Sequence, residues 1–187
     1  FALLPQRKLP GATMTLALSG GVGGAKLASG LAAVLAPEQL AIVCNTGDDF
    51  EHLGLPICPD LDTVMYTLAG RSSAARGWGL ADESWRVIGA LGELGGDTWF
   101  RLGDLDIATH LYRLNRRNAG ASLTDVTVEL CAAYGVKPAV WPMSDDRVRT
   151  VVACATGNSR YELPFQHYFV RERCQPAVSG FRFDGIA

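Results

Sequence analysis

The chain has 187 residues, of which 48% are hydrophobic and 19% are charged, and its formal net charge at pH 7 is −2. This composition excludes a disordered chain, and the length suits one sizeable α/β domain. The basic residues are scattered apart from the pair Arg116 and Arg117, which argues against a nucleic-acid partner. No apolar run reaches the roughly 18 to 20 residues that a membrane helix needs, so we expect no membrane partner.

The cysteines indicate neither a disulfide framework nor a structural zinc site. Their number is odd, they lie far apart in the sequence, and none forms a C-x-x-C pair. They are Cys44, Cys58, Cys131, Cys154 and Cys174. The first residues also lack the charged start, long apolar centre and cleavage site of a signal peptide. We therefore expect reduced thiols and a cytoplasmic protein.

The two ends of the chain differ from its centre. Residues 1–13 carry two prolines and precede Met14, so we interpret them as a native arm or a segment left by cloning. Residues 14–187 show no repeat or linker and are expected to form a single domain. Because the strand-like last residues, 181–187, have no closing helix, we expect this domain to be incomplete at its C-terminus.

A glycine cluster marks the start of the predicted fold. Residues 14–18 are apolar and predict a buried strand, and the spacing of apolar residues over 25–35 predicts a helix that Pro37 ends. Between them, in LSGGVGGAK, backbone N–H groups and the helix N-terminus could hold a nucleotide phosphate. The candidate nucleotide-binding residues are Gly20, Gly21, Gly23, Gly24 and Lys26. The cluster matches no phosphate-loop motif in full, so a tight turn without a ligand is the alternative.

A second apolar run, residues 40–44, completes a strand–helix–strand unit. Such a unit predicts two parallel strands joined by a right-handed crossover. Ligands of parallel sheets collect at the carboxyl ends of the strands, so the glycine cluster should meet the loop over 45–63 there. We therefore predict an α/β fold, with a Rossmann-like, mostly parallel sheet and flanking helices.

The loop over residues 45–63 is rich in carboxylates, and these are Asp48, Asp49, Glu51, Asp60 and Asp62. Beside an anion-binding turn they would repel one another unless a divalent cation lay between them. In PDLD the two aspartates are two residues apart, and on extended backbone both would point to one side and could share Mg²⁺ with a diphosphate. The alternative is a solvated acidic loop in which Asp60 or Asp62 caps a helix over 63–68.

The next segment predicts a loop at RGWG and then a helix over residues 81–94. Asp82 and Glu83 would lie in the first turn of this helix, where the helix dipole favours acidic side chains. Trp78 and Trp85 either pack over the planar ring of a ligand or lie in the core.

The segment RLGDLDIATH opens an amphipathic helix that should end near Gly120. Asp104 and Asp106 would occupy its first turn or cap, and His110 lies one turn after Asp106 on the same face. A carboxylate and an imidazole so placed could orient a hydroxyl or a phosphate, which makes His110 a candidate catalytic residue. A histidine held only by the neighbouring cap explains the pattern as well. Arg101 precedes the turn and offers a cation to a phosphate.

The last third of the chain is richer in strands. Residues 122–134 predict a helix with a Ser or Thr cap, closed by Gly135. Residues 137–143 and 149–155 predict strands, and 161–170 a further extended segment. We therefore predict a smaller strand-rich extension at this end of the domain.

Seven motifs, in their order and spacing, resemble the 2-phospho-L-lactate transferase family of coenzyme F-420 biosynthesis. They are LSGGVGGAK, NTGDD, CPDLDTVMYTL, RGWG, LGDLDIATH, NAGASLTDVT and PMSDDR, and the resemblance runs from about Thr15 to the last residue. It implies a Rossmann-like fold, Mg²⁺ as the metal and a homodimer. It also implies transfer of a lactyl, enolpyruvyl or glyceryl phosphate group from a guanosine-diphospho donor to the hydroxyl of the deazaflavin Fo, with release of GMP.

The resemblance further implies roles for individual residues. Asp62 matches the aspartate of the acceptor and metal site, and Arg101 stands in the place of a basic residue that contacts the acceptor. Asp49 is the expected second metal ligand, and residues 20–26 match the nucleotide turn. The family usually has an arginine within LGDRD, where this chain has Leu105, so no role is transferred to that position.

The expected reaction is attack of the deazaflavin hydroxyl on the phosphorus that carries the lactyl-type group. Mg²⁺ at Asp49 and Asp62 would offset the diphosphate charge, and Asp62 or His110 would take the proton. The family's later serine- and asparagine-containing motif, which helps to hold guanosine, does not occur in the 187 residues. A nucleotide- or deazaflavin-binding module without catalysis and another Mg-dependent nucleotidyl or glycosyl transferase are the alternatives.

Overall fold

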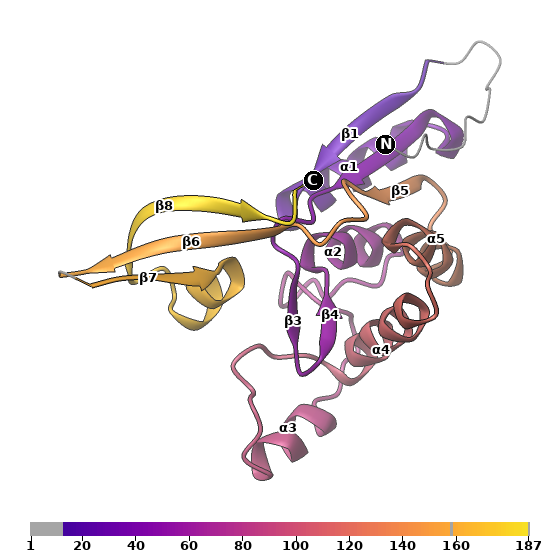
Figure 1. The fold of residues 1–187 in the computed structure, drawn as a ribbon. Coiled ribbons are helices and arrows are strands. Elements are labelled where there is room, and N and C mark those ends of the chain that lie inside the picture. The colour runs from indigo at the N-terminus through magenta and orange to yellow at the C-terminus, as the bar shows by residue number, and fades with distance from the viewer. Residues whose placement is uncertain (1–12, 158, 187) are drawn as a thin grey trace.

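The computed structural model describes residues 13–157 and 159–186 and has an α/β architecture (Figure 1). A parallel sheet of three strands has β2 at its centre, between β1 and β5. The strands are β1 (Thr15–Ser19), β2 (Leu40–Cys44) and β5 (Ala139–Pro142). The predicted fold class and the three predicted strands are confirmed. Residues 1–12 of the expected arm lie outside the described residues, and the division at residue 13 stays a prediction.

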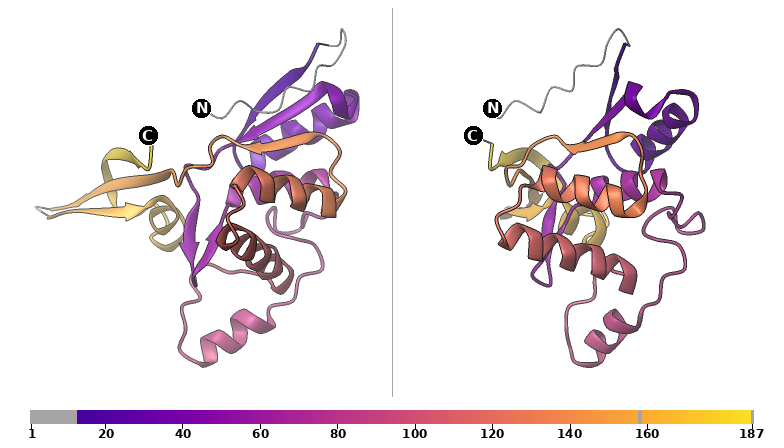
Figure 2. Two further views of the ribbon diagram at one scale, coloured as in Figure 1. Left: turned by 45° about the vertical axis from the view of Figure 1, so that its right-hand side comes forward. Right: turned by 90° about the vertical axis from the view of Figure 1, so that its right-hand side faces the viewer.

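Three helices cover one face of this sheet and form the core with it (Figures 1 and 2). They are α1 (Val22–Val34), α2 (Pro59–Leu68) and α5 (Leu123–Tyr134). Ala17, Ile42 and Val140 share one row of the sheet and are all at most 7% exposed. Because side chains alternate between the faces of a strand, this row points as a unit toward the helices. The row therefore fixes which face of the sheet is buried.

Helix α1 begins earlier than its apolar spacing predicted. It starts at Val22, so Gly23 and Gly24 lie in its first turn and Gly21 is its N-cap. The helix ends at Val34, before Pro37 as predicted, and the short 3₁₀ turn η1 (Pro37–Gln39) follows.

The carboxylate-rich segment contains regular structure that its composition did not predict. A hairpin is formed by β3 (Phe50–His52) and β4 (Leu55–Ile57), whose two-residue turn has positive φ at Leu53 and Gly54. Helix α2 then begins at Pro59. Proline fits this position because the first N–H group of a helix has no partner within the helix. The extended backbone expected for PDLD is therefore wrong, since this motif forms the first turn of a helix.

Helix α3 (Arg86–Glu93) is shorter than expected. Asp82 has a left-handed backbone with φ of 53° and cannot belong to a right-handed helix, so its placement in the first turn is wrong. Glu83 also lies outside α3, and its two carboxylate oxygens accept hydrogen bonds from backbone N–H groups at the start of the next helix. That helix, α4 (Asp104–Asn118), agrees with the prediction.

The strand-rich extension is an antiparallel sheet that projects from the body of the molecule (Figures 1 and 2). Its order is β7-β6-β8, with bounds β6 (Arg149–Thr156), β7 (Ser159–Pro164) and β8 (Ala177–Asp184). The π-helical turn η2 (His167–Arg171) follows β7, so the extended conformation expected over 161–170 is wrong in its second half. Within residues 13–157 and 159–186, no helix has the length and apolar character needed to cross a membrane.

Candidate functional site

A cavity of about 680 Å³ opens beside the carboxyl ends of β1 and β2. Its walls come from the N-terminus of α1, from α2 and α4, and from η2 of the extension. One part of the wall is acidic, with Asp48, Asp60, Asp62 and Asp106. Another part is aromatic, with Trp78, Trp99, Phe100, Phe165 and Phe169. The cavity can therefore receive a ligand that has both a charged and a flat apolar part.

The glycine cluster reaches the cavity through Gly21 and Val22. A Cβ on Gly21 would lie 2.7 Å from Asp60 Oδ1, and one on Gly24 would lie 2.2 Å from Ser19 Oγ, so close packing explains both glycines. Among the described residues, none caps the first turn of α1 with its side chain, and this turn contains no acidic residue, so its N–H groups could bind an anion. Of the five predicted nucleotide-binding residues, Gly20, Gly23, Gly24 and Lys26 are not on the cavity wall, and their role stays a prediction.

Asp60 and Asp62 point in different directions, because residues two apart on a helix are about 200° apart around its axis. Asn45 Nδ2 donates a hydrogen bond of 3.0 Å to Asp60 Oδ2, at the side of the glycine turn. Asp62 is instead buried at 4% exposure and paired with Arg113. Burial raises the pKa of Asp60, and burial together with the charge of Asp60 raises the pKa of Asp48. These two carboxylates form an acidic pair beside Gly21.

Asp49 lies behind the cavity wall. It is 5% exposed, and burial raises its pKa to about 7. Its neighbour Asp48 is the member of NTGDD that lines the cavity. The pair of metal ligands expected from the resemblance, Asp49 and Asp62, therefore does not share this wall and stays a prediction.

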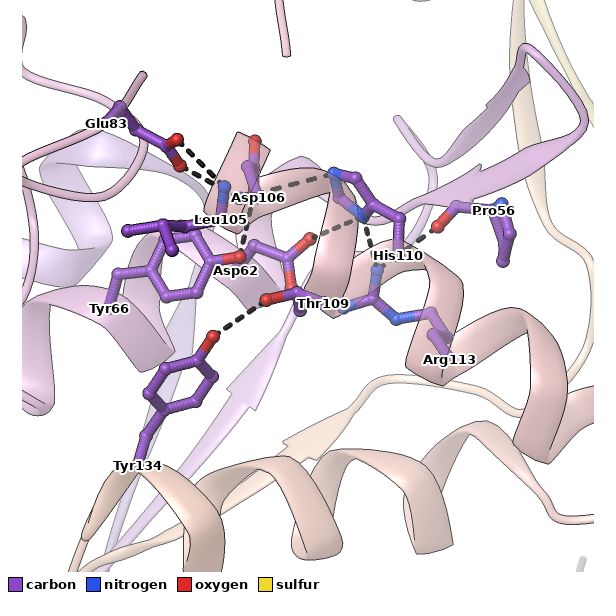
Figure 3. Close-up of polar contacts among 10 residues, drawn as sticks. All are labelled: Pro56, Asp62, Tyr66, Glu83, Leu105, Asp106, Thr109, His110, Arg113 and Tyr134. Carbon is purple, nitrogen blue, oxygen red and sulfur yellow. Dashed lines mark hydrogen bonds and ion pairs between the residues drawn. The ribbon is translucent and has the colours of Figure 1, made fainter. Parts of the chain in front are cut away.

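Asp62, Asp106 and His110 form the centre of a buried polar network (Figure 3). His110 Nδ1 lies 3.7 Å from Asp62 Oδ2, and His110 Nε2 lies 3.5 Å from Asp106 Oδ1. The hydroxyl of Tyr66 donates to Asp106 Oδ1 at 2.7 Å. Burial alone would raise the pKa of Asp106, but His110 and Tyr66 outweigh it and hold that pKa below its usual range. The histidine is thus held by more than the cap of its own helix.

Arg113 belongs to this network although, like Tyr66, it was not among the residues marked from the sequence. It follows His110 by three residues on α4, and its guanidinium donates to Asp62 Oδ1 and to the carbonyl oxygen of Pro56. Both the arginine and its carboxylate partner are almost fully buried, which makes this an internal ion pair. The sequence does contain one indication of this contact: Arg113 follows His110 by three residues, which places both side chains on one face of the helix.

The implied Mg²⁺ can be tested against these residues. One ligand atom from each of Asp62, Asp106 and His110 lies within 4.8 Å of the others. Asp62 Oδ2 is buried without a hydrogen-bond partner among the described residues, as a carboxylate oxygen awaiting a cation would be. Carboxylate oxygens suit Mg²⁺, whereas imidazole suits transition metals better. The two aspartates therefore fit the ion.

Arg101 lies on the cavity wall, as its predicted role in acceptor binding requires. Its guanidinium stacks over the ring of Trp85 at 4.6 Å, which orients the cation beside the aromatic surface. Trp78 lines the cavity and is 42% exposed, so it is not a core residue. Leu105, which replaces the usual arginine of the motif, is exposed and does not line the cavity.

Fold and site together define an α/β protein whose ligand cavity lies at the carboxyl edge of a parallel sheet, beside a glycine-rich turn into a helix. This is the arrangement of α/β proteins that bind phosphorylated ligands. Residues 15–183 match the family model described as "2-phospho-L-lactate transferase CofD". The chain belongs to this family of transferases.

Curated relatives agree with the family. The chain is 46% identical over 158 residues to a phosphoenolpyruvate transferase of Kitasatospora aureofaciens, covering 83% of this chain and 49% of the relative. It is 40% identical over 184 residues to the phosphoenolpyruvate transferase of Mycobacterium tuberculosis, covering 90% of this chain and 56% of the relative. The chain thus spans about half the length of the curated relatives that it matches.

The fold also resembles a solved structure. A crystal structure of a member of the UPF0052 family from Bacillus halodurans aligns with a TM-score of 0.56 at 12% identity. The alignment covers 92% of this chain and 51% of that protein. At this level of identity the likeness supports the α/β fold alone.

Proposed function

We propose that the protein transfers a phosphoenolpyruvyl- or phospholactyl-type group from a guanosine-diphospho donor to the hydroxyl of the deazaflavin Fo, releasing GMP. The observation that carries the proposal is the cavity, in which an acidic wall and an aromatic wall meet beside the N-terminus of α1. The names of the relatives favour enolpyruvyl over lactyl or glyceryl phosphate as the transferred group.

In the proposed complex, the aromatic wall binds the planar deazaflavin and Arg101 contacts it from the rim of that wall. The N–H groups at the start of α1 bind the diphosphate of the donor. The acceptor hydroxyl oxygen then forms a bond to the phosphorus that carries the three-carbon acid, and the bond from that phosphorus to the oxygen of GMP breaks. Such a transfer depends mainly on positioning and electrostatics, which suits a site without a dedicated strong base.

Asp62 is the proposed centre of the site, both for the metal and for the acceptor. Mg²⁺ would be held by Asp62 together with Asp49, as the resemblance implies, or with Asp106 from the opposite side of the network. When bound, the ion would offset the negative charge of the diphosphate. The proton of the acceptor hydroxyl would pass to Asp62 or His110, which both line the cavity.

We also propose that the protein works as a homodimer, which is inherited from the resemblance to the family, and that it works in the cytoplasm, as its cysteine pattern predicts. Light scattering during size-exclusion chromatography tests the first part. A mass of twice the chain supports the dimer, and a mass equal to one chain contradicts it.

The experiment is to incubate the protein with Fo, a guanosine-diphospho donor and Mg²⁺ and to follow the phosphodiester product and GMP by mass spectrometry. A competitive screen of donors distinguishes this reaction from another Mg-dependent transfer of a nucleotide or sugar. The second candidate is a nucleotide- or deazaflavin-binding module without catalysis, which the same cavity would also serve. Calorimetric binding of Fo or GDP without product from any donor would support that candidate.

A further inference from the structure

We infer that Arg113 is a positioning residue that fixes the ring proton of His110 on Nε2, and that His110 is therefore neither the base nor a metal ligand of the site. The catalytic meaning of this inference rests on the proposed function. The hydrogen-bond pattern behind it does not.

The guanidinium of Arg113 lies behind the cavity wall and meets three groups. It donates to Asp62 Oδ1 and to the Pro56 carbonyl at 3.1 Å, and its Nη1 lies 3.0 Å from His110 Nδ1 (Figure 3). Burial disfavours its charge, but Asp62 beside it raises the pKa of Arg113 above its usual value. A charged guanidinium has donors only, so each atom that it meets must accept a hydrogen bond.

His110 Nδ1 must therefore offer its lone pair to Arg113, and the ring proton is on Nε2. A carboxylate oxygen, Asp106 Oδ1, lies 3.5 Å from Nε2 and faces that proton, at a distance at which the two form an ion pair but no hydrogen bond. Without Arg113, the partner of Nδ1 would be Asp62 Oδ2 at 3.7 Å, an acceptor that draws a proton onto Nδ1. The arginine thus decides which nitrogen carries the proton.

In this arrangement the lone pair of Nδ1 is committed to Arg113, and Nε2 carries the ring proton that faces Asp106. A cation on Nε2 would require the ring proton on Nδ1, where it would face the guanidinium donor. A cation or a substrate proton on Nδ1 would compete with Arg113 for the same lone pair. The proton-accepting role in the cavity then falls to the carboxylates, and His110 serves to orient Asp106.

Nuclear magnetic resonance tests the hydrogen-bond pattern directly. In protein labelled with ¹⁵N in histidine and arginine, the His110 signals are those that disappear in His110→Gln. We expect an unprotonated Nδ1, a protonated Nε2, and a coupling through the hydrogen bond between Arg113 Nη1 and Nδ1. In Arg113→Met the proton should move to Nδ1. The matched control, Arg116→Met, removes an arginine of the same helix that pairs at the surface with Glu129 and should leave the ring signals in place.

A protonated Nδ1 in the wild-type protein overturns the inference, and so does an unchanged Nδ1 signal in Arg113→Met. If Arg113→Met does not fold, the wild-type spectrum still decides, and Arg113→Lys supplies a variant that keeps the positive charge against Asp62.

The transfer reaction tests the catalytic meaning. Arg113→Met should lower kcat/KM by about 10- to 100-fold, with partial rescue in Arg113→Lys. His110→Gln keeps an N–H near the position of Nε2, so its kcat/KM should stay about tenfold or more above that of Asp62→Asn. Equal losses in those two variants overturn the inference. Absence of transfer in the wild type, with the spectra as expected, contradicts the proposed function alone.

Discussion

Asp60 and Asp62 are two residues apart in PDLD, yet Asp60 accepts a hydrogen bond from Asn45 and Asp62 pairs with Arg113 on another helix. The helical backbone of the motif separates them. Asp60 therefore lies beside the glycine turn, and Asp62 belongs to the buried network around His110.

This separation predicts different effects of the same substitution on stability. Asp62→Asn leaves the buried guanidinium of Arg113 without its counter-ion, which should lower the free energy of unfolding by about 3–5 kcal/mol. Asp60→Asn keeps a side-chain oxygen for Asn45 and removes the repulsion with Asp48, so it should be neutral or stabilising. Urea unfolding measures both, and equal losses would contradict the separation.

The glycine cluster predicts a second contrast. A Cβ at Gly24 would lie 2.2 Å from Ser19 Oγ and 3.0 Å from Ser19 Cα, so Gly24→Ala must shift backbone and should cost about 1–3 kcal/mol. Gly23→Ala meets nothing within 4 Å and lies in the first turn of α1, where alanine favours the helix by up to about 1 kcal/mol. Measured by thermal unfolding, Tm should therefore be lower in Gly24→Ala and unchanged or higher in Gly23→Ala.

The pKa of Asp49, raised to about 7 by burial, predicts how stability depends on pH. Between about pH 4 and pH 7 the folded state holds this proton more tightly than the unfolded chain does, so the contribution of Asp49 to stability falls as pH rises. Asp49→Asn removes that loss. As pH rises from about 4 to 7, the variant should therefore become more stable relative to the wild type. The difference between their free energies of unfolding should grow by about 2–4 kcal/mol.

Urea unfolding at several pH values, in a chelator that removes divalent cations, measures this difference. The other carboxylates are the same in both proteins, so their contributions to the pH dependence cancel in the difference. A difference that stays constant, or that falls as pH rises, would contradict the assigned burial of Asp49.

The side chain of Glu83 caps the N-terminus of α4. Its two oxygens accept from the backbone N–H groups of Leu105 at 2.9 Å and Asp106 at 2.8 Å. Glu83→Ala should cost about 1 kcal/mol, because it leaves helix N–H groups without a partner, and it should loosen the turn that holds Asp106. Glu93→Ala, at an exposed position of α3, is the control, and equal Tm values for the two variants would speak against the cap.

Local patterns predicted the strands of the parallel sheet and the helix over 104–118, because each carries its own apolar period or capping signal. They failed where a long-range contact decides the conformation. Glu83 looks like a first-turn residue of its own helix but caps another one twenty-two positions away at Leu105. Asp60 and Asp62 would form a pair on extended backbone, but the helix that begins at Pro59 points their side chains in different directions.

The same limit applies to the site. The sequence marked Asp62, His110 and Arg101, which all line the cavity. It did not mark Arg113, because a single arginine on a helix is usually a solvated surface residue, and only the fold shows that Asp62 lies opposite it. It also marked Asp49 as the second metal ligand, whereas Asp48 is the neighbour that lines the cavity and Asp49 is buried behind its wall.

The role of Asp62 is tested by the rate at which Asp62→Asn forms the phosphodiester of Fo from a guanosine-diphospho donor and Mg²⁺, measured by mass spectrometry beside the wild type. We expect product and GMP from the wild type and a rate lower by about 100-fold or more in Asp62→Asn. The control Glu38→Gln, which changes an exposed carboxylate in η1, should keep the wild-type rate. Transfer by Asp62→Asn at the wild-type rate would contradict the role of Asp62.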